Sequence, residues 1–269
     1  MSAHFVSLRG DRNSNEDNHN IIIGMDNKEE SAEPLAEVNY YGVYDGHGGK
    51  FVSKFLSENI YHYFVDNKVK YPLDKEYVYK VYDGLQNILV TKYSKEAMEC
   101  GSTCLVVCHF KVGANSYLNV LNTGDSRCVL SRNNIAHTLS RDHKPDWPDE
   151  KSRIMKLGGQ IKKVGKTYRI NDLSVSRAFG DIESSKYVTH RPDIYKYKIK
   201  TKDRFMIIAC DGLWDVVSPQ DVVNFVLDNC YDSDMKRINL NINIATKLAE
   251  LAIKKESGDN VTCIVVFFN

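Results

Sequence analysis

Apolar residues recur along the chain in short runs that are rich in β-branched and aromatic side chains. Runs of this length and composition are typical of β-strands, in which such side chains pack well on a pleated surface. They predict strands at residues 4–8, 21–23, 38–44, 103–111, 117–122, 128–131, 204–210 and 261–268.

A second pattern places apolar residues at the three- and four-residue spacing of one helix face. It predicts helices at residues 51–64 and 78–89, and another at about 242–255. Ser218 followed by Pro219 is typical of an N-cap and a first helical residue, so a further helix begins there. A helix at 150–157 is expected to end at the following glycines. The longest stretch without a clear pattern is 182–203.

The order of these elements favours an antiparallel α+β fold built in layers. Strands come in hairpin-like runs and helices in pairs between them, which differs from regular βαβ alternation. No repeat, low-complexity segment or linker rich in proline or serine divides the sequence. We therefore expect a single domain over residues 1–269.

Composition narrows the classes of partner. The 36 basic and 35 acidic residues nearly cancel, so no overall field favours nucleic acid or a membrane surface. The seven cysteines lie mostly in apolar runs without metal-ligand spacing, as expected for reduced core residues. No apolar run is long enough to span a membrane, and no signal peptide is present. We expect an intracellular protein, cytoplasmic or nuclear, and a monomer.

Acidic residues follow or precede several of the predicted strands. Two apolar strands end in an Asp-Gly pair, Asp45-Gly46 and Asp211-Gly212, and Asp259 stands just before the last strand. A carboxylate at a strand end is rigidly placed, and the next glycine permits a sharp turn whose carbonyl can also face a cation. Oxygen donors without a His or Cys cluster suit Mg²⁺ or Mn²⁺.

Glu16 and Asp17 form a further acidic pair between the first two predicted strands, four and five residues after Arg12. An arginine fork matches two oxygens of a phosphate group. Taken alone, however, Arg12 is better explained by a surface ion pair with Glu16 or Asp17.

Other hydrolytic chemistries lack their signatures. None of the cysteines has the arginine six residues later that a cysteine-nucleophile phosphatase needs, and no GxSxG elbow is present. The glycines at 46, 48 and 49 do not form GxGxxG, and the Gly165-Lys166-Thr167 segment lacks the first Walker glycine. Nucleotide binding is therefore not expected.

At this point the motifs resemble, in order and over nearly the whole chain, the metal-dependent PP2C (PPM) family of protein phosphatases. The resemblance implies a central β-sandwich of two antiparallel sheets flanked by helix pairs, with a metal cleft at one end. The matching segments are 10–12 (GDR), 15–17 (NED), 43–49 (VYDGHGG), 101–103 (GST), 122–127 (NTGDSR), 142–145 (DHKP), 173–181 (LSVSRAFGD), 210–216 (CDGLWDV) and 258–260 (GDN).

The resemblance also assigns metal ligands. It implies two Mg²⁺ or Mn²⁺ ions bridged by Asp45, with the Gly46 carbonyl on one ion and Asp211 and Asp259 on the other. Glu16 and Asp17 would act through metal-bound waters. Asp125 and Asp215 resemble positions that hold a third, weaker ion with Asp211, although either could instead orient backbone amides.

The implied reaction is hydrolysis of phosphoserine and phosphothreonine by a water or hydroxide shared between the two ions. Arg12 would bind the substrate phosphate, and His47 would protonate the leaving alkoxide as general acid. Thr103, Ser176 and Asp181 lie in matching motifs, but we expect them to tie loops together.

Segment 159–170 resembles the flap beside the cleft of this family. Its positive charge, carried by Lys162, Lys163, Lys166 and Arg169, predicts a preference for phosphosites with acidic neighbours. The alternative is that the segment is a solvated basic loop. Two alternatives to a protein phosphatase remain. One is a pseudophosphatase that binds partners with the same fold, and the other is a phosphohydrolase that acts on small molecules.

Overall fold

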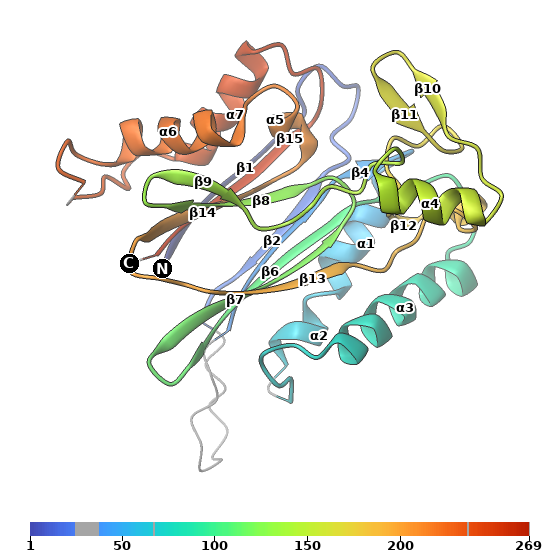
Figure 1. The fold of residues 1–269 in the computed structure, drawn as a ribbon, viewed down its shortest axis with the longest axis horizontal. Helices are drawn as coiled ribbons and strands as arrows, with labels where there is room; N and C mark the ends of the chain where they lie inside the picture. Colours follow the sequence, from blue (N-terminus) through green and yellow to red (C-terminus); the bar gives the residue numbers. More distant parts are fainter. Residues whose placement is uncertain (25–37, 67, 236, 269) are drawn as a thin grey trace.

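Two five-stranded antiparallel sheets lie face to face at the centre of the computed structural model (Figure 1). The structure describes residues 1–24, 38–66, 68–235 and 237–268. One sheet has the order β1 (Ser2–Leu8), β15 (Val261–Phe267), β14 (Asp203–Ala209), β8 (Arg127–Arg132) and β9 (Ile135–Thr138). The other has the order β13 (Asp193–Lys198), β7 (Asn115–Thr123), β6 (Cys104–Val112), β3 (Asn39–Tyr44) and β2 (Asn18–Ile22).

The inner strands are buried on both faces, which explains their nearly continuous apolar sequences. Successive side chains of a strand point to opposite faces. In β3, Tyr41 and Val43 pack between the two sheets, whereas Tyr40 and Tyr44 pack against helices. All seven cysteines are buried and unpaired, as expected for core residues.

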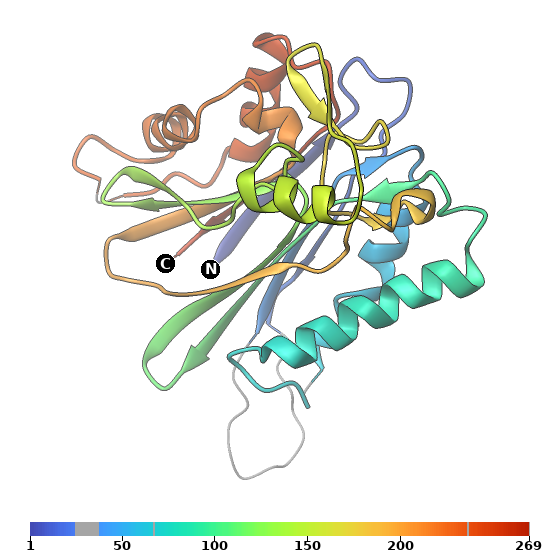
Figure 2. The ribbon, with the colours of Figure 1, turned by 45° about the vertical axis from the view of Figure 1, so that its right-hand side comes forward.

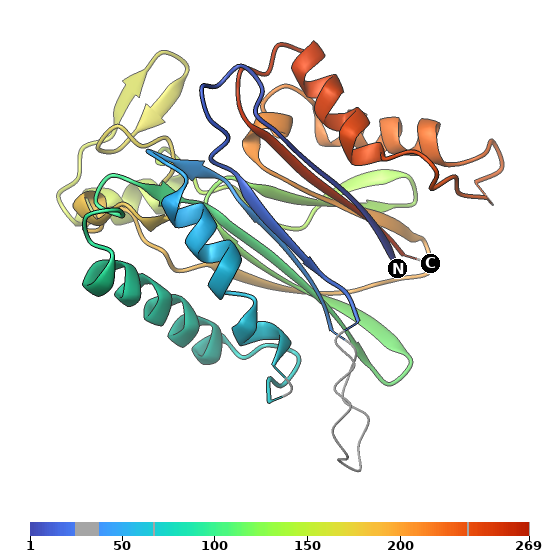
Figure 3. The same ribbon diagram turned by 180° about the vertical axis from the view of Figure 1, so that it is seen from behind.

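Helices cover the outer face of each sheet, so the layers run helix, sheet, sheet, helix (Figure 3). The first sheet is covered by α5 (Asp211–Trp214), α6 (Pro219–Cys230) and α7 (Ile244–Lys254). The second is covered by α1 (Phe51–Asn59), α2 (His62–Val65) and α3 (Lys75–Lys92). The expected antiparallel sandwich with flanking helices is confirmed.

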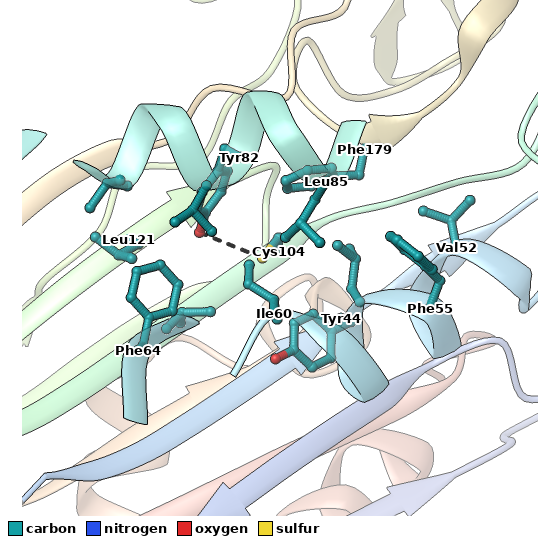
Figure 4. Packing of buried hydrophobic residues seen from close by; sticks show 14 of the residues in the cluster. Tyr44, Val52, Phe55, Ile60, Phe64, Tyr82, Leu85, Cys104, Leu121 and Phe179 are labelled. Atoms are coloured by element: carbon teal, nitrogen blue, oxygen red, sulfur yellow. Dashed lines mark hydrogen bonds between the residues drawn. The ribbon is translucent and has the colours of Figure 1, made fainter. Parts of the chain in front are cut away.

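Figure 4 shows the packing under the α1–α3 layer. Tyr82 and Leu85 of α3 point toward the sheet, where Cys104 lies, and Phe55 of α1 and Tyr44 of β3 belong to the same cluster. The Tyr82 hydroxyl lies 3.6 Å from the Cys104 sulfur, so the buried phenol has a polar partner. The cluster anchors β3, the strand that leads to Asp45.

Side-chain caps begin three of the helices, and the cap at Ser218 was predicted. The Ser218 hydroxyl accepts a hydrogen bond from the Asp221 N–H, with Pro219 as the first residue of α6. Asp74 accepts from two N–H groups at the start of α3. At the start of α7, the Asn243 side chain accepts from the Thr246 N–H.

The local structure differs from the predicted elements in one segment and adds elements in another. Residues 51–64 form two helices, because Tyr63 and Phe64 donate to carbonyls three residues back and the turn tightens after α1. The unpatterned stretch 182–203 contains the short helix η1 (Ile182–Ser184) and the edge strand β13.

Smaller elements gather at one end of the sandwich (Figure 2). They are a three-stranded sheet of β4 (Gly46–His47), β5 (Gly101–Ser102) and β12 (Phe179–Gly180), helix α4 (Pro148–Lys156), and the hairpin of β10 (Lys162–Val164) and β11 (Thr167–Arg169). Among the described residues, no helix is both long and apolar enough to cross a membrane.

Candidate functional site

Four aspartates from different strands meet at this end of the sandwich. Asp45 follows β3, Asp125 lies between β7 and β8, Asp211 follows β14, and Asp259 precedes β15. Antiparallel pairing brings these ends together, since the start of one strand lies beside the end of its neighbour. All four line a cleft of about 600 Å³.

Carboxylate oxygens of Asp45, Asp125 and Asp211 lie within 4.8 Å of one another. Asp17, between β1 and β2, has an oxygen within the same distance of Asp45. The structure therefore brings residues that are far apart in the sequence into one acidic centre.

The acidic centre perturbs the pKa values of its members. Burial, followed by the charges of neighbouring aspartates, raises the pKa of Asp45 and of Asp211 well above the usual value. Burial with the charge of Asp259 raises the pKa of Asp17 to about 6. Each carboxylate would be more stable in its charged form beside a cation.

The acidic centre fits hard divalent cations. Among the described residues, neither carboxylate oxygen of the buried Asp17 has a hydrogen-bond partner, which is costly unless another ligand is bound. Clustered oxygen donors are the ligands that Mg²⁺ and Mn²⁺ prefer. Cys210 also lies near Asp17 and Asp45, but burial raises its pKa, so it remains a neutral core thiol.

The glycines after two of the aspartates have a different role from the one predicted. Neither Gly46 nor Gly212 has a positive φ angle, so neither is required for a left-handed turn. A Cβ at Gly46 would collide with the Glu16 carbonyl, and one at Gly212 with the Asn260 carbonyl. Each glycine instead lets two chain segments pack closely behind the cleft.

The loop between β1 and β2 carries Arg12 to the cleft. The Arg12 guanidinium donates from Nη2 to Asp259 Oδ2 at 2.7 Å, and its side chain is 59% exposed. The alternative explanation, an ion pair of Arg12 with Glu16 or Asp17, is not found among the described residues; the oxygens of Glu16 accept from Ser14 and from the Gly49 N–H. Arg12 is thus held only by an exposed contact and can turn toward another anion.

Asn260 fixes this loop against the start of β15. Its side-chain amide donates to the carbonyls of Arg9 and Ser14, and its Oδ1 accepts the Glu16 N–H. One side chain therefore sets the path of the loop that holds Arg12, Glu16 and Asp17.

His47, on β4, is paired with Asp181. The His47 Nε2 lies 2.9 and 2.8 Å from the two oxygens of Asp181, which is 3% exposed. Burial lowers the pKa of His47, but the hydrogen bond and charge of Asp181 outweigh this effect, and the net pKa is raised. We had expected Asp181 only to tie loops together, so this pairing was missed.

Thr103 has the structural role expected of it. Its hydroxyl accepts the Asp45 N–H at 3.1 Å, and its own N–H donates to the Asp45 carbonyl at 2.9 Å. The backbone that carries Asp45 is therefore clamped on both sides.

Sequence reasoning also missed Lys144, although its DHKP segment had been noted. Its ammonium contacts Asp125 Oδ2 directly and lies 4.0 Å from Asp211 Oδ2. Burial lowers its pKa, but the charges of Asp125 and Asp211 reverse this effect and raise it. Asp215 lies one helical turn after Asp211, outside the group of three clustered aspartates.

Comparison with known proteins extends the resemblance noted in the sequence. The protein phosphatase 2C family model matches residues 2–261. "Probable protein phosphatase 2C 59" of Oryza sativa subsp. japonica is 34% identical over 273 residues, covering 100% of this chain and 76% of that protein. A PP2C-like domain-containing protein of Acanthamoeba polyphaga mimivirus is 41% identical over 169 residues, covering 56% of this chain and 94% of that protein.

Solved structures share the fold. A serine-threonine phosphatase 2C from Toxoplasma gondii superposes with a TM-score of 0.75 and 24% identity, covering 99% of this chain and 94% of that one. A C. elegans sex-determining protein has a TM-score of 0.80 and 23% identity, covering 99% of this chain and 64% of that one. Because the family model matches residues 2–261 of this chain, the chain belongs to the protein phosphatase 2C family.

Proposed function

We propose that this protein is a serine/threonine phosphatase that hydrolyses phosphoserine and phosphothreonine by direct attack of water, with two Mg²⁺ or Mn²⁺ ions as cofactors. The observation that carries the proposal is the cluster of Asp45, Asp125 and Asp211 in a cleft that Arg12 also lines. Two bound divalent ions supply a water of lowered pKa and neutralise phosphate charge.

The residues around the cleft divide into ligand sets. Asp45 would be shared between the two ions, because its oxygens lie near both Asp17 and Asp211. The remaining proposed ligands are the Gly46 carbonyl, Asp211 and Asp259 directly, Glu16 and Asp17 through water, and Asp125 and Asp215 for a third, weaker ion.

Arg12 would bind the substrate phosphate. In the structure it neutralises Asp259, and its exposed side chain can turn to phosphate once Asp259 has another partner. The guanidinium offers parallel N–H donors to two phosphate oxygens, which orients the phosphorus for in-line attack.

His47 would act as general acid. Asp181 holds its Nε2, and the raised pKa favours the doubly protonated ring. Nδ1 is then the nitrogen that donates a proton to the departing serine or threonine oxygen.

The flap would select the substrate. Arg169 of β11 and Asp172 line the cleft, and Lys162, Lys163 and Lys166 are exposed on the hairpin. We expect acidic residues beside the phosphosite to be favoured. In a phosphopeptide panel, replacing these three lysines with glutamate should remove that preference, and a wild-type protein without any preference would contradict the assignment.

The decisive experiment measures phosphate release from a phosphothreonine peptide with Mn²⁺ or Mg²⁺, and with EDTA. Asp211→Ala should abolish turnover, whereas Asp228→Ala, at an exposed position on α6, should not. Metal-loaded, folded wild type that is inactive on several phosphopeptides would favour the pseudophosphatase. Turnover of small phosphoesters with none of phosphopeptides would favour a small-molecule phosphohydrolase.

We also propose that the chain acts as one catalytic domain and as a monomer. Sedimentation equilibrium over a tenfold range of concentration should give a mass near 30.7 kDa throughout. A mass that rises toward twice this value would contradict it.

A further inference from the structure

The segment that carries Lys144 is fixed to the segment that carries Asp125. The His143 N–H donates to the Gly124 carbonyl at 3.0 Å, and the Gly124 N–H donates back to His143 Nδ1 at 3.1 Å. The Asn122 side-chain amide connects the two segments, since it donates to the Gly124 carbonyl at 3.1 Å and to the Arg141 carbonyl at 2.8 Å. Lys144 and Asp125 therefore lie on neighbouring backbone segments that are hydrogen-bonded to each other.

His143 itself cannot move freely. Its side chain is fully buried, its Nε2 lies 3.2 Å from Asp193 Oδ2, and its carbonyl accepts the Ser176 N–H at 2.9 Å. Asp193 is held in turn by Arg177 at 2.9 Å. The backbone at Lys144 is fixed, so its ammonium can change position only by rotation of its own side chain.

The ammonium lies among the carboxylates that a third ion would need. It contacts Asp125, which is 2% exposed, and lies 4.0 Å from Asp211 Oδ2. Asp125 and Asp211 have oxygens within 4.8 Å of each other, so one cation can satisfy both. Two cations cannot share this space without strong repulsion, because like charges a few ångströms apart interact strongly in a partly buried site.

We propose that Lys144 is a tethered cation that occupies the position between Asp125 and Asp211 and competes with the third metal ion. The inference rests on the proposed function, because it assumes the two other ions. It assigns the weakness of the third site to this side chain: the ion binds only after the ammonium has swung away. The two stronger sites are built on Asp45 with Asp17, Asp211 and Asp259, and among the described residues only Asp211 of this set lies within ion-pair distance of the ammonium, at 4.0 Å.

Isothermal titration with Mg²⁺ or Mn²⁺ tests the competition without any activity assay. Wild type should bind two ions tightly and one weakly. Lys144→Met should bind the third ion at least about tenfold more tightly, within the usual range of coupling between neighbouring sites, with a smaller change at the first two, which share Asp211. Lys144→Arg, which keeps the charge, and Lys166→Met, at an exposed flap position, should both leave the third ion weak.

A second measurement uses the unaltered side chain. With lysines ¹³C-labelled at Cε, the Lys144 resonance, assigned from the Lys144→Arg variant, should show its largest shift as the third Mg²⁺ ion binds. The inference is overturned if this resonance does not shift in the third binding step, or if Lys144→Met binds only two ions or a third of unaltered affinity. Failure of every protein to bind the first two ions would instead refute the proposed function and the inference with it.

Discussion

Two neighbouring acidic residues at the start of α4 allow a buried and an exposed ion pair to be compared directly. Glu150 is 2% exposed and accepts from Arg177 at 3.0 and 2.6 Å and from Arg153 at 2.8 Å. Asp149 is 54% exposed and pairs with Arg141. Both lie in the first helical turn, so their interaction with the helix dipole is similar.

Glu150→Ala removes the shared partner of two arginines. Arg177 is only 14% exposed and keeps one other anion, Asp193, so a partly uncompensated charge stays buried. Breaking such a pair from one side costs about 3–5 kcal/mol, whereas an exposed pair contributes about 0–1 kcal/mol. We therefore expect Glu150→Ala to lower the free energy of unfolding several times more than Asp149→Ala.

Urea unfolding of the two variants and wild type at pH 7, followed by far-UV circular dichroism, measures the difference. In thermal unfolding of the same proteins, the melting temperature should fall by roughly 6–20 °C for Glu150→Ala, at about 2–4 °C per kcal/mol for a protein of this size. Equal losses for the two variants, or a loss below about 1 kcal/mol for Glu150→Ala, would refute the reasoning.

The ion pairs of Glu150 with Arg177 and Arg153 also predict how the free energy of unfolding depends on pH. Burial alone would raise the pKa of Glu150, but Arg177 and Arg153 outweigh it, so the folded pKa lies below the unfolded one. The stabilisation is fully present above the unfolded pKa of about 4.3 and is lost as the pH falls through the folded value. The gap between wild type and Glu150→Ala should be constant from pH 8 to 5 and shrink below about pH 4.

Three further predictions concern other parts of the molecule. His109 is 1% exposed, and burial lowers its pKa to about 4. Wild type should therefore lose up to about 3 kcal/mol of its free energy of unfolding as the pH falls from 6.5 to 4, and His109→Gln should not show this loss. Urea unfolding of both proteins at the two pH values would measure the difference. Arg12→Lys keeps the charge but not the fork, so kcat/KM on a phosphopeptide should fall about tenfold or more with stability unchanged; undiminished turnover would contradict the phosphate role. Mn²⁺ at about 100 times its Kd should stabilise wild type by about 2.7 kcal/mol in thermal unfolding and Asp45→Asn much less, and equal stabilisation would argue against Asp45 as a ligand.

The sequence predicted the inner strands well because their physical situation is simple. β3, β6, β14 and β15 are buried on both faces, and such strands are nearly continuous apolar runs whatever their neighbours are. β9 and β13 are edge strands with exposed polar positions, so their patterns are short or interrupted. An edge strand forms because it pairs with the neighbouring strand of its sheet, and a local sequence pattern does not reveal that pairing.

The residues of the cleft also fall into two groups, those that a local sequence pattern predicts and those that it does not. Asp45, Asp211 and Asp259 stand at strand ends and were predicted from that position. The partners of charged side chains were not predicted, because each depends on packing across the chain: Arg12 with Asp259 is the clearest case. The contact of Lys144 with Asp125 likewise requires two loops to be hydrogen-bonded together.

The two chain ends lie side by side, far from the cleft. Ser2 pairs with Phe267 at one end of β1 and β15, and Leu8 pairs with Val261 at the other end, beside the cleft (Figures 1 and 2). Seven strand residues separate the termini from the cleft by about 20 Å. The β6–β7 turn at Gly113 also lies at the end of its strands away from Asp45. A gene that joins the present ends through a short linker and begins at this turn would encode a rearranged chain in which every loop bearing a carboxylate of the cleft is uncut. In this architecture, the order in which the polypeptide is synthesised is separable from the arrangement of the side chains around the cleft.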